Sequence, residues 1–322
     1  MIKVNKVIAL IVSTVFLLHS PTTANAVVGS DRPVKAGEAT WVGSVVSWDG
    51  KSGYQSFCSG SLIAPQILLT AAHCVMDAVD QETWKVVIGQ SSQTAGDGQM
   101  INVIGAIYHK KYEVQQSYDI LDPVTYEVID SITGYVAPGE SELDSDIALI
   151  LLEKPVKGIT PVKMANYSTK IAPLWRVYGW GSTSTNNFAG SDVLKTTSVA
   201  DATAEMSEMI DDPMTNMLAA YLEDEQGVVH STCYGDSGGP LVDGNGILLG
   251  ITSFSFAETC EEASPTVYTK VASYRSWIMR ASSKITRSVN RNPGKAISTE
   301  LSGIKNKHGN NVYHPILIIS TY

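Results

Sequence analysis

Short apolar runs separated by turn-forming residues are the main pattern between about residues 27 and 280. Glycine, serine, asparagine and aspartate separate these runs, which lie at Val42–Trp48, Ser61–Thr70, Trp84–Ile88, Ile101–Ile107, Ile147–Leu152, Trp175–Tyr178, Ile247–Ile251 and Val267–Val271. Short runs that repeat many times between turn residues predict the strands of an all-β sandwich or barrel. Two segments, Met206–Leu222 and Val271–Met279, place apolar residues three and four positions apart and predict helices without changing this class.

The N-terminal segment, residues 1–26, differs from the rest of the chain. Lys3 and Lys6 precede an apolar run at residues 7–18, and Ala24-Asn25-Ala26 follows. A basic start, an apolar middle and a small-residue cleavage box predict a secretory signal peptide, with a buried N-terminal core helix as the alternative. The apolar run is too short to span a bilayer. We therefore expect a secreted protein, extracellular or periplasmic, with no membrane span after signal cleavage.

Composition narrows the class further. The chain has 322 residues, 44% apolar and 17% charged, which excludes collagen-like, disordered and coiled-coil proteins. Its net charge of −9 argues against a nucleic-acid-binding surface. Secretion makes disulfides plausible, and the four cysteines, Cys58, Cys74, Cys233 and Cys260, allow three pairings that the residues alone do not separate.

Two segments stand apart from the strand-rich body. Residues 112–144 form a long acidic connection, and connections beyond about fifteen residues are usually functional or disordered. Residues 281–322 contain six basic residues and one acidic residue, whereas residues 27–280 contain 15 basic and 31 acidic residues. A basic tail on an acidic body suggests docking onto the body or contact with a partner, and a solvated, poorly ordered terminus is the alternative.

Three short stretches carry candidate chemistry. They are Thr70-Ala71-Ala72-His73-Cys74, Asp144-Ser145-Asp146-Ile147-Ala148-Leu149 and Cys233-Tyr234-Gly235-Asp236-Ser237-Gly238-Gly239-Pro240. Taken alone, His73 and Asp146 have ordinary explanations as a packed histidine and a turn aspartate. Ser237 is different, because its glycine-rich flanks predict a tight exposed turn with converging N–H groups, as an oxyanion site requires.

Two serine-hydrolase scaffolds use such a serine. Residues 235–239 match the G-x-S-x-G nucleophile elbow, which leads into a helix and precedes its aspartate and histidine. Here Pro240 and a strand–turn–strand pattern follow, and the only later histidines lie in residues 281–322. The histidine and aspartate stretches precede the serine, which is the order of the second scaffold, a Ser-His-Asp peptidase.

With these motifs the chain resembles the trypsin/chymotrypsin family of secreted serine endopeptidases from Val27 to about Arg280. Further matching stretches are Val27-Val28-Gly29-Ser30, Phe57-Cys58-Ser59-Gly60-Ser61-Leu62-Ile63, Tyr178-Gly179-Trp180-Gly181, Ser253-Phe254-Ser255 and Pro265-Thr266-Val267-Tyr268-Thr269-Lys270-Val271. The resemblance implies two packed six-stranded antiparallel β-barrels with the active site between them and a C-terminal helix. Residues 27–280 would form this peptidase domain.

The same resemblance assigns roles. Ser237 would attack the scissile carbonyl, His73 would carry its proton, and Asp146 would orient His73. The N–H groups of Gly235 and Ser237 would bind the oxyanion, and Ser253 would hydrogen-bond near the aspartate. The implied function is hydrolysis of protein or peptide substrates through an acyl-enzyme, by a monomer. A catalytically silent binding or regulatory homologue and an esterase are the alternatives.

Family members also share cross-links and a mode of activation. The resemblance implies the disulfides Cys58–Cys74 and Cys233–Cys260, and an ion pair between a new N-terminal amine at Val27 and Asp236. Because Val27 directly follows the cleavage box, we expect signal peptidase itself to create the active N-terminus. No cofactor or metal is expected, since residues 89–100 lack the set of acidic residues that holds calcium in some relatives.

The primary specificity pocket is expected to be neutral and shallow. Ser231 stands at the pocket floor, where an aspartate selects arginine or lysine in the family. Ser255 and Thr266 stand where relatives with deep pockets have glycine. This set predicts cleavage after small to medium uncharged residues, with chymotrypsin-like aromatic specificity as the alternative. Basic specificity would require an acidic side chain from residues 258–262 to reach in.

Overall fold

The computed structural model describes residues 27–30, 32–51, 53–78, 84–112, 114–121, 128–136, 145–182, 185, 190–291 and 317–321. The signal peptide predicted for residues 1–26 lies outside these ranges. Within them, every helix is too short or too polar to cross a membrane.

Six antiparallel strands close into a barrel in the first half of the chain. In hydrogen-bonded order around the barrel they are β2 (Val42–Trp48), β3 (Tyr54–Ala64), β4 (Ile67–Thr70), β9 (Ala148–Leu152), β6 (Gln99–His109) and β5 (Trp84–Ile88), which pairs again with β2. Strands β4 and β9 are buried along their whole length, which explains why their sequences are continuous apolar runs. Leu62, Ile107 and Leu149 are among the side chains that fill the barrel.

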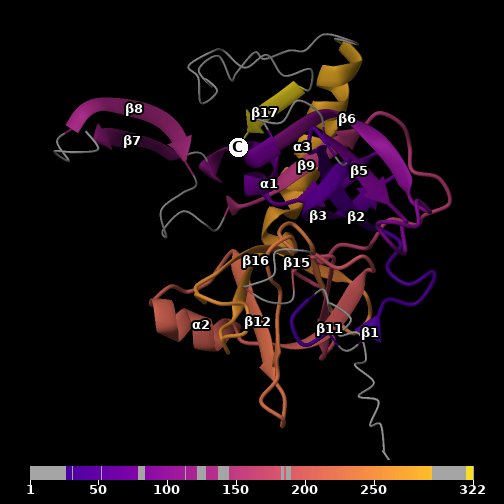
Figure 1. Ribbon diagram of the computed structural model, residues 1–322, viewed down its shortest axis with the longest axis vertical. Helices are drawn as coiled ribbons and strands as arrows, with labels where there is room; N and C mark the ends of the chain where they lie inside the picture. The colour runs from indigo at the N-terminus through magenta and orange to yellow at the C-terminus, as the bar shows by residue number, and fades with distance from the viewer. Residues whose placement is uncertain are drawn as a thin grey trace, which may run out of the picture.

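A second barrel of six antiparallel strands follows. Its circuit is β11 (Lys195–Asp201), β10 (Trp175–Gly179), β14 (Pro240–Val242), β15 (Leu248–Ser255), β16 (Thr266–Lys270) and β12 (Met217–Glu223), closed by the pairing of β12 with β11. Short strands extend it, with β1 (Arg32–Pro33) on β11 and β13 (Val229–His230) on β12. The two barrels confirm the predicted fold class, and Figure 1 shows one above the other.

Three α-helices accompany the barrels within the described residues: α1 (Ala72–Ala78), α2 (Thr203–Ile210) and α3 (Val271–Arg291). Helix α3 rises from the end of β16 along the first barrel (Figure 1). It buries Val271, Ile278 and Ile285, whose seven-residue spacing, about two helical turns, places them on one face. The helix expected at residues 271–279 therefore exists and is longer, so the predicted domain boundary at residue 280 falls inside it.

The helix predicted at Met206–Leu222 is only half right. Helix α2 ends at Ile210, and Asp211 takes a left-handed conformation at its C-terminus with φ of 52°. Pro213 follows closely and prevents the helix from resuming. The second half of the apolar pattern is strand β12, whose pairing with β16 runs from Met217 opposite Thr269 to Ala220 opposite Thr266.

Two further elements lie outside the barrels' closed circuits. The acidic segment contains a hairpin of β7 (Val114–Leu121) and β8 (Val128–Val136), after a 3-10 turn η1 (Lys110–Tyr112). Figure 1 shows this hairpin directed away from both barrels. The last described element, β17 (Leu317–Thr321), pairs in parallel with β6.

Candidate functional site

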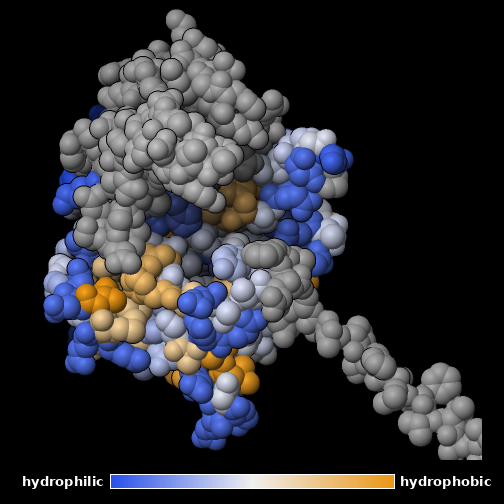
Figure 2. All heavy atoms as spheres, turned by 60° about the vertical axis from the view of Figure 1, so that its left-hand side comes forward, coloured by the Kyte–Doolittle hydropathy of each residue, from blue (hydrophilic) through white to orange (hydrophobic). Residues whose placement is uncertain are grey.

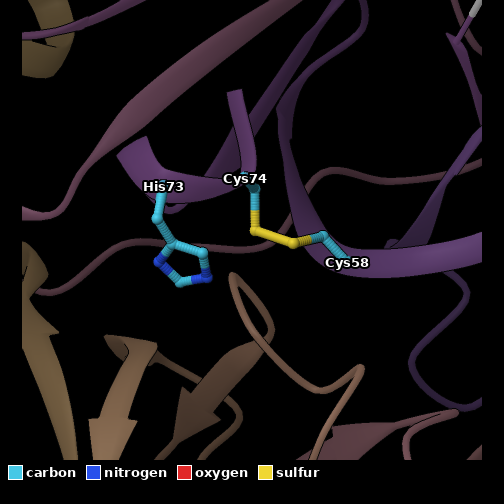
Figure 3. Close-up of side chains that lie close together, drawn as sticks. All are labelled: Cys58, His73 and Cys74. Atoms are coloured by element: carbon cyan, nitrogen blue, oxygen red, sulfur yellow. A yellow bond between two sulfur atoms is a disulfide. The ribbon is translucent and has the colours of Figure 1, made fainter. Parts of the chain in front are cut away.

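His73 is placed by the junction of a buried strand and a short helix. Strand β4 ends at Thr70, and His73 is the second residue of α1. Figure 3 shows its ring beside a disulfide that joins Cys74 to Cys58 of β3. This covalent bond holds the first turn of α1 against the barrel wall, so the backbone that carries His73 has little freedom.

Asp146 receives the His73 ring and a second side chain. The His73 Nδ1 lies 2.8 Å from Asp146 Oδ2, and the His73 backbone N–H donates to Asp146 Oδ1 at 3.0 Å. The Ser253 hydroxyl donates to Oδ2 at 2.6 Å. The carbonyl of Asp146 accepts a hydrogen bond from Thr269 Oγ1 at 2.8 Å, so β16 of the second barrel also holds this residue. Ser253 thus lies where the sequence comparison expected it.

The electrostatics of this pair define the histidine's tautomer. Burial acts to raise the pKa of the Asp146 carboxyl, but the charge of His73 and the hydrogen bonds from His73 and Ser253 outweigh it and hold the pKa below its usual value. An ionised Asp146 accepts the Nδ1–H of His73. The Nε2 atom of a neutral ring is then left with its lone pair, which can accept a proton.

Ser237 sits in a glycine-rich loop in which two glycines take conformations that favour glycine. Gly235 and Gly238 adopt left-handed conformations with φ of 91° and 75°. A Cβ on Gly238 would overlap the Thr70 side chain and lie 2.5 Å from the Ser59 carbonyl oxygen. The Gly238 N–H donates to Thr252 O at 2.8 Å, which fixes the far side of the loop.

The Ser237 loop also contacts the first barrel. Ser59 of β3 donates its N–H to the Ser237 carbonyl at 2.7 Å and its hydroxyl to the Gly235 carbonyl at 3.3 Å. Ser59 follows Cys58, which is bonded to Cys74 next to His73. In the described part of the chain, the N–H groups of Gly235 and Ser237 donate to no protein acceptor. Two donors beside a hydroxyl are the arrangement that stabilises an oxyanion.

Asp236, between these donors, is a buried carboxylate. Its oxygens accept the backbone N–H groups of Gly181 at 2.9 Å and Cys233 at 3.0 Å. Burial raises the pKa of Asp236 to about 7, against the lowering effect of these hydrogen bonds. Val27 is fully buried in the core of the second barrel, and Val28 pairs with Ser231. In the intact chain the Val27 nitrogen is an uncharged amide.

A cavity of about 210 Å³ opens beside Ser237. Ser231 and Thr266 line it and are buried, and their hydroxyl oxygens are 2.8 Å apart. Thr232 donates to Thr266 Oγ1 at 3.0 Å. Ser231, the predicted floor residue, and Thr266, a predicted wall residue, therefore meet in one hydroxyl cluster. Ser255 lines the more exposed part of the cavity. The second disulfide, Cys233–Cys260, also borders this cavity.

The acidic residues near this cavity have backbone and hydroxyl partners. Glu262 lines the cavity, and its carboxylate accepts the Glu258 N–H at 2.7 Å. Glu261 instead accepts the hydroxyl of Thr185 at 2.9 Å. Of the acidic residues considered from the sequence, Glu262 is therefore the one placed to reach a charged group inside the cavity.

The sequence analysis missed an aromatic pair at the cavity edge. Phe254 lines the cavity, and its ring meets that of Phe256 in a T-shaped arrangement at 5.3 Å between centroids. Figure 2 shows hydrophobic side chains gathered on the lower half of the molecule, the half that the second barrel occupies. Phe256, Tyr234 and Met209 are among its exposed apolar residues. The signal was present in the sequence as phenylalanine on both sides of Ser255.

A second cavity of about 430 Å³ lies on the other side of Gly235. Its lining includes Gln55, Phe57, Gln93, Asp192, Tyr234 and Gly235. The two cavities thus flank the Ser237 loop, one at the specificity residues and one toward the first barrel. Tyr234 lines both cavities, so they meet near the loop that carries Ser237.

A group of potential metal ligands occurs at Cys58, His73 and Cys74 among the described residues. The two sulfur atoms are bonded to each other (Figure 3), so neither is a free thiolate. Asp97, in the loop where some relatives hold calcium, accepts the N–H of Ser91 at 3.1 Å. The sulfur atoms of the first group are thus used in the disulfide, and Asp97 accepts a hydrogen bond within its own loop.

Comparison with known proteins agrees with this arrangement. The trypsin family model matches residues 28–278. A trypsin from Squalus acanthias is 32% identical over 233 residues, which cover 70% of this chain and 85% of the relative. Chymotrypsin-like elastase family member 1 from Homo sapiens is 32% identical over 271 residues, covering 80% and 93%. Neuropsin, a serine protease expressed in the limbic system of mouse brain, superposes with a TM-score of 0.57 at 26% identity and covers 78% of this chain and 98% of its own.

Proposed function

Because the chain belongs to the trypsin family and is a serine-type endopeptidase, we propose that Ser237, His73 and Asp146 form its catalytic triad. The Ser237 hydroxyl attacks the scissile carbonyl while its proton passes to His73 Nε2. His73 then gives this proton to the leaving amine, and an acyl-enzyme remains on Ser237 Oγ. Water, activated by His73 in the same way, hydrolyses the acyl-enzyme. Asp146 stabilises the imidazolium in both steps.

The proposed oxyanion hole consists of the N–H groups of Gly235 and Ser237. These two donors would stabilise the negative charge that develops on the substrate carbonyl oxygen, and one such donor contributes about 3 kcal/mol in comparable sites. Gly235 can aim its N–H there because its left-handed backbone is accessible to glycine without steric cost.

The observation that carries the proposal is the Asp146 carboxylate, which accepts His73 Nδ1 at 2.8 Å within a site flanked by two cavities. The test is labelling of the processed protein by a fluorophosphonate probe. We expect labelling that Ser237→Ala abolishes and that Ser168→Ala retains, since Ser168 is exposed and bonds only locally to Asn166. A folded processed protein without labelling would favour the catalytically silent homologue.

We propose further that the protein is secreted and that signal cleavage activates it. Removal of residues 1–26 would convert the Val27 nitrogen from an amide to an ammonium ion close to the loop of Asp236. A buried carboxylate with only neutral donors gains most from such a cation. N-terminal sequencing of active material should give Val27, and active protein that starts elsewhere would contradict the proposal.

The pocket residues support cleavage after small to medium uncharged residues. An arginine entering the cavity would meet the hydroxyls of Ser231 and Thr266, and an unpaired buried charge costs several kcal/mol, or a factor of about 10³ in rate. The side chains of Ser255 and Thr266 reduce the space for an aromatic ring.

A panel of peptides that differ only in the residue before the cut tests this preference. We expect alanine, valine, threonine or leucine to be preferred, and Ser231→Asp to introduce cleavage after arginine. Preference of the unmodified enzyme for arginine or lysine would contradict the argument from Ser231 and point to Glu262. Preference for phenylalanine or tyrosine would contradict the argument from Ser255 and Thr266.

A further inference from the structure

Strand β6 has a backbone edge that the first barrel does not cover. Strand β5 pairs with β6 only from Gln99 to Asn102. From Gly105 to Tyr108, the opposite edge of β6 pairs with β9. Beyond residue 102 β5 no longer covers this edge of β6, and a strand edge of this kind is a template for binding another strand.

The C-terminal end of this same chain lies on that edge. Strand β17 runs parallel to β6, with Leu317 opposite Gly105 and Thr321 opposite His109. Figure 1 shows β17, in yellow, beside β6 and α3 in the upper barrel. Residues far apart in the sequence are thus joined in one sheet.

The sequence of the C-terminal segment suits this position. Ile316–Ile319 is the longest apolar run after residue 291, in a segment that is otherwise mostly polar and basic. Uncharged segments rich in β-branched residues have high strand propensity and are prone to aggregate when exposed. Pairing with β6 therefore covers both the edge of β6 in the barrel and the apolar C-terminal segment.

We propose that the edge of β6 at residues 105–109 is a binding site for one extended, uncharged, apolar peptide strand, and that residues 317–321 of the chain are its occupant. Backbone hydrogen bonds along the edge supply the affinity, as in other cases of strand addition. The site goes beyond the peptidase function, since it uses none of Ser237, His73 and Asp146.

The position of the site connects it to the segment that carries Asp146. Thr321 is opposite His109, and the His109 N–H donates to the Ile147 carbonyl at 3.0 Å. The Ser145 hydroxyl, on the other side of Asp146, lies 3.1 Å from Tyr274 OH of α3. The occupied edge therefore belongs to the same packed region that positions the aspartate.

Hydrogen exchange on the full chain tests the proposal, with Ser237→Ala present to prevent self-digestion. We expect amides of residues 317–321 to exchange at least tenfold more slowly than in a free peptide of residues 311–322. Proline placed singly at 317, 318, 319 and 320 should remove this protection at alternate positions, because alternate residues direct their N–H toward β6. Exchange at free-peptide rates in the unmodified segment would overturn the proposal without requiring any variant to fold.

A binding measurement distinguishes the site from its occupant. A fluorescent peptide of residues 312–322 should bind the full chain carrying Ile318→Asp and a disruptive proline at least tenfold more tightly than the unmodified chain, whose edge is occupied. A scrambled peptide is the control and should bind neither. Failure of the disrupted chain to bind the native peptide would refute the site. Protection at 317–321 that appears only as protein concentration rises, together with a dimer in sedimentation, would refute the intramolecular occupant.

Discussion

At the scale of single residues, the buried Asp236 makes the stability of the intact chain depend on pH. Burial raises the pKa of Asp236 to about 7 in the intact chain. Between about pH 4 and 7 the unfolded chain has lost this proton while the folded chain retains it, so the free energy of unfolding falls as pH rises. Above pH 7 the free energy of unfolding no longer changes through Asp236, because its carboxyl is ionised in both the folded and the unfolded chain.

We therefore expect the unprocessed chain carrying Ser237→Ala to lose up to about 4 kcal/mol of stability between pH 4 and pH 7, three pKa units at 1.36 kcal/mol each. The chain that starts at Val27 should lose much less, because its ammonium group compensates the carboxylate. Urea unfolding at several pH values measures both. Asp236→Asn should flatten the profile of the unprocessed chain, and identical slopes in the two chains would contradict the coupling.

The glycine after Ser237 gives a second residue-scale prediction. Gly238→Ala places a Cβ against Thr70 and the Ser59 carbonyl at φ of 75°, so the loop must move and probe labelling should fall at least 100-fold. Gly246→Ala is the matched control, because its φ is 73° and no atom lies within 4 Å of the added Cβ. This control should cost only about 1 kcal/mol of backbone strain and retain labelling. Equal loss in both variants would show that strain, not the contact, is responsible.

At the scale of elements, the main secondary structure described in the acidic segment, residues 112–144, is the β7–β8 hairpin. It leaves the barrel after Tyr112, which is buried, and the chain returns at Ser145 directly before Asp146. Its position in the sequence is where the family places a loop over the substrate subsites before the scissile bond. Its acidic residues would favour basic or neutral substrate side chains there.

Replacing residues 114–143 with a short turn should broaden the cleavage of folded proteins and leave the hydrolysis of small ester substrates unchanged. The reason is that a small ester needs only the cavity beside Ser237, whereas a folded substrate is large enough to contact a hairpin that projects from the barrels. Cleavage profiles by mass spectrometry and ester kinetics measure the two effects. An unchanged protein cleavage profile would support a solvated insertion with no role in selection.

At the scale of the whole molecule, the two barrel cores and the two disulfides both stabilise the fold. The Cys58–Cys74 bond closes a separation of 16 residues, which corresponds to about 3 kcal/mol in the chain-entropy model. Chains of this size bury enough surface to fold without cross-links. The barrel core should therefore survive the loss of this bond.

We expect the double variant Cys58→Ala, Cys74→Ala to keep native far-UV circular dichroism and to lose about 3 kcal/mol in urea unfolding. Probe labelling should fall by a larger factor than the fraction of unfolded protein explains, because Cys74 adjoins His73. The double variant Cys233→Ala, Cys260→Ala is the comparison, since its separation of 27 residues predicts a similar loss of stability. Failure of either variant to fold would show that the core alone is insufficient.

The sequence by itself was sufficient to predict an all-β class from its apolar runs and, through the family resemblance, the two barrels. Strand runs such as Val42–Trp48 are local patterns of buried side chains, and they appear at the same residues in the structure. The glycines around Ser237 are also a local signal, because backbone conformation depends mainly on the residue and its neighbours. Motifs in a fixed order therefore identified the family before any contact was known.

Only the tertiary structure decided how distant segments meet. The residues alone allowed three pairings of the four cysteines, and the structure has the two disulfides that the family resemblance implied, Cys58–Cys74 and Cys233–Cys260. The apolar spacing of Met206–Leu222 fitted one helix, but pairing with β11 and β16 closes the second barrel and makes Met217–Glu223 strand β12. The parallel strand β17 likewise depends on an edge some two hundred residues earlier in the chain. Periodicity reports which side of a segment is buried, whereas its partner is chosen by the packing of the whole chain.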